Sequence, residues 1–96
     1  MVMAKAVVDG TVIAESDSTV VVEGNHYFPP SSVNWDLLDR TELTTVCGWK
    51  GLANYYSLRT PNGMLENVAW TYHEPKDAAS EIKDFVAFYP QVSVEA

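Results

Sequence analysis

The sequence predicts a mostly β fold of the α+β class, in which compact antiparallel sheets are accompanied by two short helices. β-branched residues occur in short runs through the first third of the chain, and two-residue turns separate these runs. Two later apolar segments, residues 52–59 and 64–72, are joined by the turn sequence Thr60-Pro61-Asn62-Gly63. Because 96 residues suit one modest core, we expect a single domain over residues 1–96.

The first third of the chain is predicted to be a β meander of three strands followed by a short extended piece. Asp9-Gly10, the strongest short hairpin signal, joins the first two strands, and Asp17-Ser18 joins the second and third. Gly24-Asn25 ends the third strand, and Pro29-Pro30 stops the extended piece. The four segments are residues 5–8, 11–16, 19–23 and 26–28.

Two short segments, residues 33–38 and 76–84, are predicted to be helices. Ser31 or Ser32 can cap the first helix, and Asp77 can cap the second. Each helix would bury a small apolar face. The inward residues would be Val33, Leu37 and Leu38 in the first helix, and Ala78, Ala79 and Ile82 in the second.

The second half of the chain returns to β structure after the first helix. Glycine-containing turns over residues 47–51 and 60–63 separate three strands, Glu74-Pro75 ends the third, and Pro90 separates two final short pieces. The predicted strands are residues 43–46, 52–59, 64–72, 85–89 and 91–95. For the whole chain we expect about seven strands. The arrangement of these strands as a tent-like pair of sheets is what the family resemblance described below implies.

The charge balance excludes several classes of partner. Thirteen acidic residues against six basic ones give a net charge of −7, and the basic residues are scattered singly. Nucleic acids and anionic membrane surfaces attract clustered Lys and Arg, so we expect neither as a partner. No apolar run is long enough to span a membrane, and no signal peptide is recognisable, which favours a cytoplasmic protein.

Cofactor and metal motifs are absent from the sequence. Cys47 is the only cysteine, so the chain has neither a disulfide framework nor a C-x-x-C metal motif. A P-loop, a dinucleotide fingerprint, H-E-x-x-H and G-x-S-x-G are also missing. We therefore expect no cofactor and no metal, although an enzyme with a dispersed site stays open.

The turn Cys47-Gly48-Trp49-Lys50-Gly51 is the first candidate site. Lys50 and the backbone N–H groups of the turn could stabilise a Cys47 thiolate, although a lone cysteine is more commonly a small buried hydrophobe, and we favour that interpretation. Gly48 and Gly51 permit positive φ values and close approach of a ligand, and Lys50 could bind a carboxylate or phosphate. Alternatively, Trp49 packs at the edge of the core and Lys50 is solvated.

A second polar cluster lies at residues 23–27. Glu23 or His26 could act as a general base beside the Asn25 amide. The alternative is a simple strand end with Asn25 in the left-handed region and His26 at the surface, and we favour it modestly.

Aromatic residues on the two long strands could line a pocket. Alternation places Tyr55 and Tyr56 on opposite faces of one strand, while Trp70 shares a face with Tyr72 on the next. Pairing of Trp70 with either Tyr55 or Tyr56 would form an aromatic wall, which can line a ligand pocket or fill a core. For Trp70 the core is the better prediction.

Three blocks of the sequence resemble the bacterial domain-of-unknown-function family 427. These blocks are VVEGNHYFPPSSVNWDLL, TTVCGWKGLANYYSL and AWTYHEPKDAASEIKDFVAFY, and the resemblance extends from Lys5 to Glu95. It implies a compact, mostly antiparallel β domain that is similar to tent-like proteins. The family is sometimes labelled nucleotidyltransferase-like, but the chain has no G-S motif followed by paired aspartates, so that activity is not expected.

Two positions depart from the family pattern. A proline usually follows the cysteine and another follows the tyrosine of the W-x-Y segment, whereas this chain has Gly48 and His73 there. We therefore expect a looser turn at Gly48 and no required catalytic role for His73.

Two functions remain open. In the first, the domain binds a small molecule in a pocket between the sheets; the molecule could be anionic, and the domain could also be an enzyme. Its ligand site would contain Trp49, Lys50, Tyr56 and Trp70, with Glu23, His26 and Cys47 as catalytic candidates. This requires Glu23 and Lys50 side chains within about 12 Å of each other. In the second, the domain is a non-enzymatic interaction module or homodimer, with an exposed Trp35 as an interface anchor.

Overall fold

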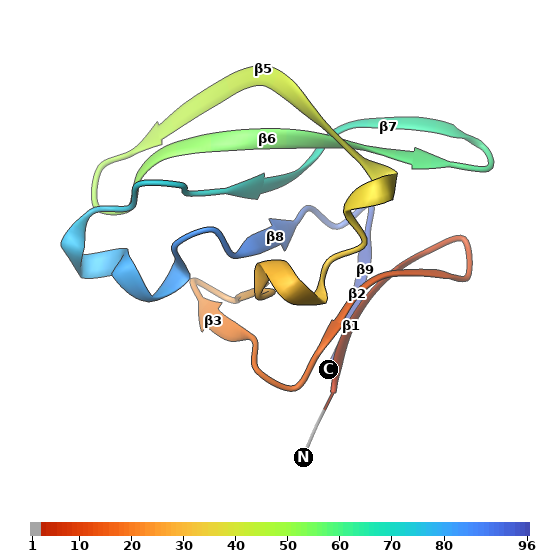
Figure 1. The fold of residues 1–96 in the computed structure, drawn as a ribbon, viewed down its shortest axis with the longest axis horizontal. Helices are drawn as coiled ribbons and strands as arrows, with labels where there is room; N and C mark the ends of the chain where they lie inside the picture. The colour runs from red at the N-terminus through yellow and green to blue at the C-terminus, as the bar shows by residue number, and fades with distance from the viewer. Residues whose placement is uncertain (1–2) are drawn as a thin grey trace.

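A computed structural model describes residues 3–96 of the chain. The chain in this range forms nine strands and three 3-10 helices (Figure 1). The strands are β1 (Ala4–Val8), β2 (Thr11–Ser16), β3 (Val20–Val22), β4 (Asn25–Tyr27), β5 (Leu38–Cys47), β6 (Gly51–Thr60), β7 (Gly63–Thr71), β8 (Val86–Phe88) and β9 (Ser93–Glu95). The 3-10 helices are η1 (Pro30–Ser32), η2 (Trp35–Leu37) and η3 (Asp77–Ile82).

The strands form three antiparallel sheets. A four-stranded sheet has the order β5-β6-β7-β8, a three-stranded sheet the order β2-β1-β9, and β3 and β4 form a separate hairpin. The mostly β class is therefore confirmed, but the sheets number three rather than two. In Figure 1 the long strands β5, β6 and β7 lie along one side of the molecule, and the other two sheets lie across from them.

The predicted meander is correct for its first hairpin and wrong for its third strand. β1 and β2 pair as predicted around Asp9-Gly10, whose φ values of 50° and 78° are those of a type I′ turn. β3 does not continue this sheet, because it pairs with β4 instead. The free side of β1 is taken by β9 from the other end of the chain. A pairing between the chain termini leaves no local signal in the sequence.

The two predicted α-helices are absent from residues 3–96, where only 3-10 turns occur. In the first segment Val33 is extended and bridges to Ala14, while the Asn34 N–H donates to the carbonyl of Ile13 at 2.7 Å. These bonds to β2 interrupt the helix between η1 and η2. In the second segment Ala79 has a non-helical φ of −121°, and Lys83, with a ψ of 125°, has left the helical region and bridges to Tyr72. Tertiary pairing thus overrides helical spacing in both segments.

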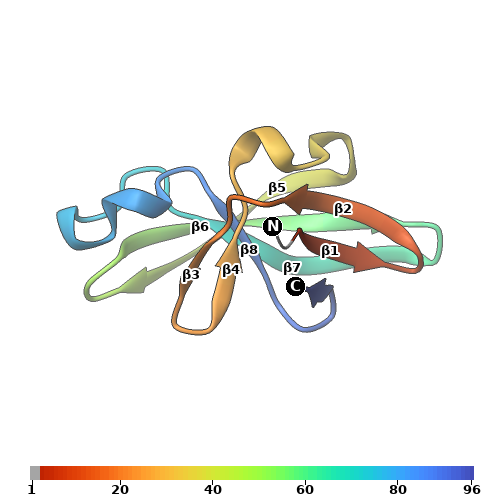
Figure 2. The ribbon, with the colours of Figure 1, turned by 90° about the horizontal axis from the view of Figure 1, so that it is seen from below.

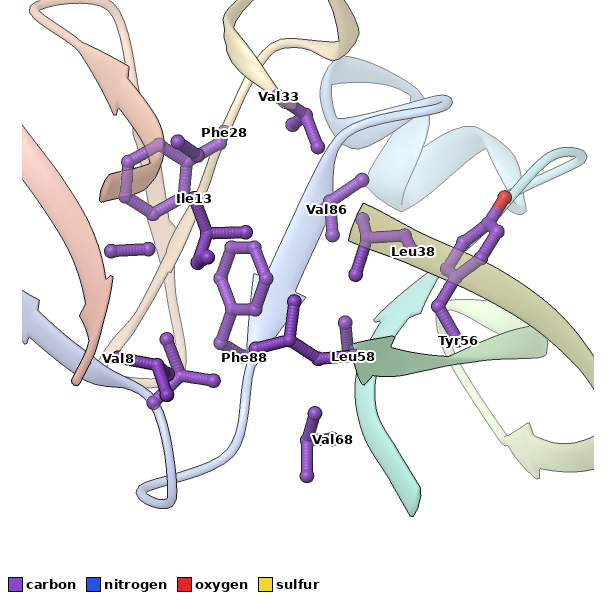
Figure 3. Close-up of a cluster of buried hydrophobic side chains, with 14 of the residues drawn as sticks. Val8, Ile13, Phe28, Val33, Leu38, Tyr56, Leu58, Val68, Val86 and Phe88 are labelled. Carbon is purple, nitrogen blue, oxygen red and sulfur yellow. The ribbon is translucent and has the colours of Figure 1, made fainter. Parts of the chain in front are cut away.

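Two apolar cores lie on opposite faces of the four-stranded sheet. Cross-strand partners point to the same side of a sheet, so the pairs Tyr56–Ala69 and Tyr55–Trp70 mark its two faces. The first face carries Tyr56 and packs on the β2-β1-β9 sheet; several residues of this core appear in Figure 3. The second face carries Tyr55 and packs on η3 and Tyr27.

Irregular pairing bends the two long hairpins. The register shifts between Arg40 and Thr44 on β5, and again between Tyr56 and Leu58 on β6. Opposite the second shift, Asn67 has a φ of 53°. The Thr41 hydroxyl donates to the Asn67 side-chain oxygen at 2.6 Å and connects the two irregular places. Such bulges strengthen the local twist, and on β5 they also interrupt an unpaired sheet edge.

Candidate functional site

The β5–β6 turn, residues 48–50, is held in place by the segment that follows β7. The Lys76 N–H donates to the Lys50 carbonyl at 2.9 Å, and the Lys76 ammonium donates to the Gly48 carbonyl at 2.7 Å. Gly51 ends the turn with a φ of 113°, and an added Cβ there would lie 3.4 Å from the Glu74 carbonyl oxygen. The positive φ predicted for this turn therefore occurs at Gly51 and is not seen at Gly48.

Lys50 is buried, with only 7% of its surface exposed. Its ammonium group forms an ion pair with Glu23 and lies 5.5 Å from the centre of the Trp49 ring and 5.6 Å from that of Tyr72. Burial disfavours the charged form, but the hydrogen bond with Glu23 and the nearby Tyr27 and Tyr72 hydroxyls outweigh it, so the pKa of Lys50 is raised. The alternative of a solvated lysine is therefore wrong, and Lys50 is a buried cation.

Glu23 approaches Lys50 from the tip of the β3–β4 hairpin. Glu23 and Gly24 form the turn with φ values of 53° and 81°, so the left-handed residues are these two, while Asn25 belongs to β4. These φ values match those of the Asp9-Gly10 turn, so Glu23 occupies the first central position of a type I′ hairpin turn. Its side chain remains 52% exposed. The hydrogen bond with Lys50 lowers the pKa of Glu23, and the Trp49 indole adds to the effect.

Cys47 lies at the other end of the same turn and is partly buried. Backbone N–H groups of Lys50 and Trp49 face its sulfur and lower the pKa of the Cys47 thiol, and the Lys50 charge acts in the same direction. Burial and the Glu23 carboxylate oppose this shift. The pKa of Cys47 is therefore lowered, and the residue also packs against the second core.

Aromatic residues of the second core adjoin Lys50 through Tyr72. The Trp70 indole N–H donates to the Tyr27 hydroxyl at 3.1 Å, and the two rings meet edge to face with centres 6.2 Å apart. Trp70 pairs with Tyr55 across the β6–β7 hairpin, and its ring packs at a tilt of 49° against Tyr89, with ring centres 4.6 Å apart. The aromatic wall thus forms on the Tyr55 face, and its Trp70 is a core residue, as predicted.

Sequence reasoning missed Tyr27 and Tyr72 as neighbours of Lys50. Both are buried, and each belongs to a strand end that becomes adjacent to the turn only through the tertiary fold. For Tyr72 a signal existed in its alternation with Trp70, which placed both rings on one face. For Tyr27 no local signal exists.

Two of the proposed site residues lie elsewhere. Tyr56 is on the opposite face of the sheet, where its ring packs edge to face on Trp35 with centres 5.4 Å apart. Burial raises the pKa of Tyr56. The His26 Nδ1 atom is hydrogen-bonded to the Thr19 hydroxyl at 2.9 Å, and its side chain lines a separate cavity of about 340 Å³. The fold brings together four of the proposed residues, Glu23, Cys47, Trp49 and Lys50. Trp70 lies in the second core, where it is bonded to Tyr27.

His73 is paired with Asp84. Its Nδ1 atom lies 2.8 Å from the Asp84 carboxylate, and its Nε2 atom is buried without a hydrogen-bond partner among residues 3–96. With Arg40 and Asn54, His73 lines a surface hollow of about 280 Å³ on the Tyr56 face of the sheet. This hollow is distinct from the Lys50 cluster.

Neither a metal-binding cluster nor a membrane-spanning helix occurs within residues 3–96. No group of three or more His, Cys, Asp and Glu side chains in this range could hold a metal ion. In the same range no helix has the length and apolar character needed to cross a membrane.

The fold and the cluster define an antiparallel β domain in which a buried lysine is paired with a half-exposed glutamate beside a cysteine-containing turn. The chain belongs to the family described as a domain of unknown function, DUF427, whose sequence profile matches residues 2–96. This match confirms the resemblance seen in the three sequence blocks. A comparison with curated proteins finds no match for the chain.

Proposed function

We propose that this domain binds a small anionic molecule at Lys50, with Glu23 as the counter-ion that the ligand replaces. The supporting observation is the pairing of a buried ammonium group with a half-exposed carboxylate on a hairpin tip. A buried lysine needs a negative partner, because an unpaired charge in a low-dielectric site is costly. The partner need not be Glu23, since a ligand carboxylate or phosphate satisfies the same requirement.

The turn supplies further favourable groups for an anion. Backbone N–H groups of Trp49 and Lys50 are directed toward the Cys47 sulfur and would favour a negative charge nearby. The exposed Trp49 ring and the buried Tyr72 ring flank the ammonium group and offer apolar surface to the body of a ligand. Once displaced, the Glu23 carboxylate becomes available to accept a proton or to bind a cationic group of the ligand.

An enzymatic function at the same place is the second candidate, and it rests on Cys47. A thiol whose pKa is lowered by two N–H groups and a lysine is a better nucleophile at neutral pH than an ordinary cysteine. In this function Lys50 would fix the anionic part of a substrate, and Cys47 would attack an electrophilic centre of it. Glu23, released from Lys50, would be the nearby base.

The interaction-module alternative is favoured by a different observation. Val46 and Leu52 are cross-strand partners with 78% and 48% of their surfaces exposed, and Trp49 lies in the turn between them with 41% exposed. Trp35 is a weaker anchor than expected, because its indole N–H is bound to the Pro30 carbonyl and its ring packs on Tyr56. A homodimer would use the Val46–Leu52 surface.

For either function we expect a cytoplasmic protein that has neither a nucleic acid nor a membrane as its partner.

A thermal-shift screen with small carboxylates and phosphates tests the proposal. A ligand at about a hundred times its dissociation constant should stabilise the protein by about 2.7 kcal/mol, which is a shift of many degrees for a domain of this size. Lys50→Met should abolish the shift, and Glu23→Gln should increase it, because the competing carboxylate is gone. Lys83→Met, which removes an exposed lysine, is the control.

The outcomes separate the candidate functions. A ligand whose thermal shift is retained in Lys50→Met would contradict the proposed site. A ligand whose shift is lost in the control Lys83→Met would also contradict it. If the screen finds no hit, sedimentation of the wild type and Val46→Asp at several concentrations is the next measurement. A dimer that Val46→Asp dissociates would replace ligand binding by the interaction-module function.

A further inference from the structure

We infer that the surface hollow between Arg40 and His73 is a second binding site, which takes a small zwitterion, an α-amino acid with an apolar side chain. The hollow has a volume of about 280 Å³ and is lined by Arg40, Leu52, Asn54, His73 and Glu74. Ligand pockets usually measure about 300–1,000 Å³, so this hollow suits a small molecule. Figure 2 shows the β5–β6 turn and the segment after β7 at one end of the molecule, away from β1 and β2.

The side chains that line the hollow share the Tyr56 face of the sheet. Arg40 is the cross-strand partner of Tyr56, and Asn54 precedes Tyr56 by two residues on the same strand. Asn54 in turn pairs with Thr71, so His73, two residues further on, lies on this side as well. The Arg40 Nη2 atom donates to the Asn54 side-chain oxygen at 2.9 Å, which places these two groups in direct contact.

Arg40 is the positive pole of the hollow. Its bond to Asn54 orients the guanidinium group and leaves the other N–H groups for a ligand. Within residues 3–96 no carboxylate forms an ion pair with Arg40. Because the Asn54 oxygen is occupied, its NH₂ group is the part left to donate. The two side chains therefore match a carboxylate, which accepts hydrogen bonds from a planar set of N–H groups.

Glu74 and Asp84 supply the negative pole. Glu74 lines the hollow and has no ion-pair partner in the part of the chain that the structure describes, so it is not paired with Arg40. The Asp84 carboxylate bonds to the His73 Nδ1 atom at 2.8 Å and holds the ring in the wall. The His73 Nε2 atom is shielded from solvent, so the ring serves as wall and not as a proton carrier.

The Tyr56 hydroxyl is influenced by both poles. Burial is the main cause of the raised pKa of Tyr56, while the positive charge of Arg40 lowers that pKa and the negative charge of Asp84 raises it. Both charges therefore act on the same phenol. This agrees with the strand pairing, which places Arg40 beside Tyr56.

The combination of charges and apolar surface selects the ligand class. A ligand with only a negative charge would face Glu74 and Asp84 unfavourably, and one with only a positive charge would face Arg40 unfavourably. A carboxylate beside an ammonium group satisfies both poles. Leu52 and its cross-strand partner Val46 are exposed on the same face and offer apolar surface to the side chain of an amino acid.

Three matched probes test this class by amide chemical-shift titration of ¹⁵N-labelled protein. L-Leucine carries both charges, isocaproate lacks its ammonium group, and isoamylamine lacks its carboxylate. We expect L-leucine to shift the amides of Arg40, Asn54 and His73. The two singly charged probes should bind there at least about tenfold more weakly, the effect of a lost hydrogen bond to a charged group. The same titration on Lys50→Met should give an unchanged affinity for L-leucine, which separates this site from the proposed anion site.

Variants at the two poles complete the test. Arg40→Met removes the positive pole and Glu74→Gln the negative one, and each should weaken L-leucine binding about tenfold. Arg40→Lys keeps the charge but loses the planar set of donors, so its affinity should be intermediate. Glu81→Gln removes an exposed carboxylate outside the hollow and should bind as the wild type does. The spectra themselves report whether each variant is folded.

Three results would overturn the inference. The first is that L-leucine does not shift these amides at millimolar concentration. The second is that isocaproate or isoamylamine binds there as tightly as L-leucine, since one charge would then be sufficient. The third is that Arg40→Met and Glu74→Gln, while folded, bind L-leucine as tightly as Glu81→Gln, since the shifts would then arise elsewhere.

Discussion

Lys50 is a residue whose environment in the structure differs from the one that its place in a turn suggests. A lysine in a tight turn is ordinarily solvated, yet this one is 7% exposed and is held by Glu23 and two aromatic rings. Glu23 reaches it from a two-residue hairpin turn, whose φ values match those of the type I′ turn at Asp9-Gly10. A buried charge with one carboxylate partner makes Lys50 a candidate functional position.

The Glu23–Lys50 pair predicts a specific pH dependence of stability. The folded-state pKa of Glu23 lies below its ordinary value of 4.5, so the unfolded state binds more protons in acid. The stabilisation is present above pH 4.5 and is lost as the pH falls through the folded pKa. The raised pKa of Lys50 gives the opposite arm, since its stabilisation is present below 10.5 and is lost as the pH rises above that value.

Urea unfolding of the wild type and Glu23→Gln over this acid range measures the effect. The variant should be less stable than the wild type at neutral pH, and the difference should shrink below pH 4.5. Asp17→Asn, which changes an exposed carboxylate on a turn, is the control. A difference that stays constant with pH would show that the ion pair is not the cause.

Cys47 should titrate below an ordinary thiol, and two neighbours should move it in opposite directions. Lys50→Met should raise the pKa of Cys47, because a nearby cation is lost, whereas Glu23→Gln should lower it, because a nearby carboxylate is lost. The rate of iodoacetamide alkylation as a function of pH gives all three pKa values. If the two variants shift the profile in the same direction, the charges are not what tunes the thiol.

At the scale of the element, the conformation of the β5–β6 turn is independent of the side chain at position 48. The turn is held by the hydrogen bonds from Lys76 to its carbonyl groups and by the close approach of Gly51 to Glu74. Neither contact depends on the side chain at position 48. Gly48 has no atoms within 4 Å of a would-be Cβ, and its φ is not positive. The looseness expected at Gly48 is thus compensated by contacts from the segment after β7.

Alanine at the two glycines of this turn should have opposite effects. Gly51→Ala should cost more than about 1 kcal/mol, since its φ of 113° is strained for any side chain. Gly48→Ala should be neutral or stabilise by about 0.5 kcal/mol, because it only reduces the freedom of the unfolded chain. Denaturant unfolding of both variants measures this, and equal losses would mean that the turn conformation differs from the one described.

At the scale of the whole molecule, the four-stranded sheet separates the first core from the second core, which adjoins the candidate site. Tyr56 and Leu58 belong to the first core, whereas Tyr55 and Ala53 belong to the second, which also holds Tyr27 below Lys50. The first face is covered only over part of its length, since Leu52 at its start is 48% exposed while Leu58 is fully buried.

Leu58 and Leu52, on one face of one strand, should therefore respond very differently to truncation. Leu58→Ala should cost about 2–5 kcal/mol, because it removes buried methyl groups and leaves a cavity. Leu52→Ala should change stability by no more than about 0.5 kcal/mol. Chemical denaturation of the two variants is the measurement. A large loss in Leu52→Ala would indicate that this face is covered in solution, as it would be in a homodimer.

Much of the fold could be predicted from local patterns, and the failures share one cause. The hairpins around Asp9-Gly10 and residues 60–63 were correct, because turn chemistry acts over a few residues. The helices were wrong because Val33 and Lys83 pair with distant strands. In the candidate site, Cys47, Trp49 and Lys50 are neighbours in sequence and could be predicted together. Tyr56 lies on the other face of the sheet, because alternation separates Tyr55 from Tyr56 but does not tell which of them faces the site.

The sequence by itself determined the family, the antiparallel β class, the local turns and the residues of the cysteine–lysine turn. Each of these depends on residue types at short spacing, where steric preference and alternation act directly. Only the tertiary structure decided that Glu23 meets Lys50, that Tyr27 and Tyr72 lie beside it, and that His26 faces another cavity. Those contacts join strands far apart in the chain, and their energies come from burial and charge pairing that no short window of sequence records.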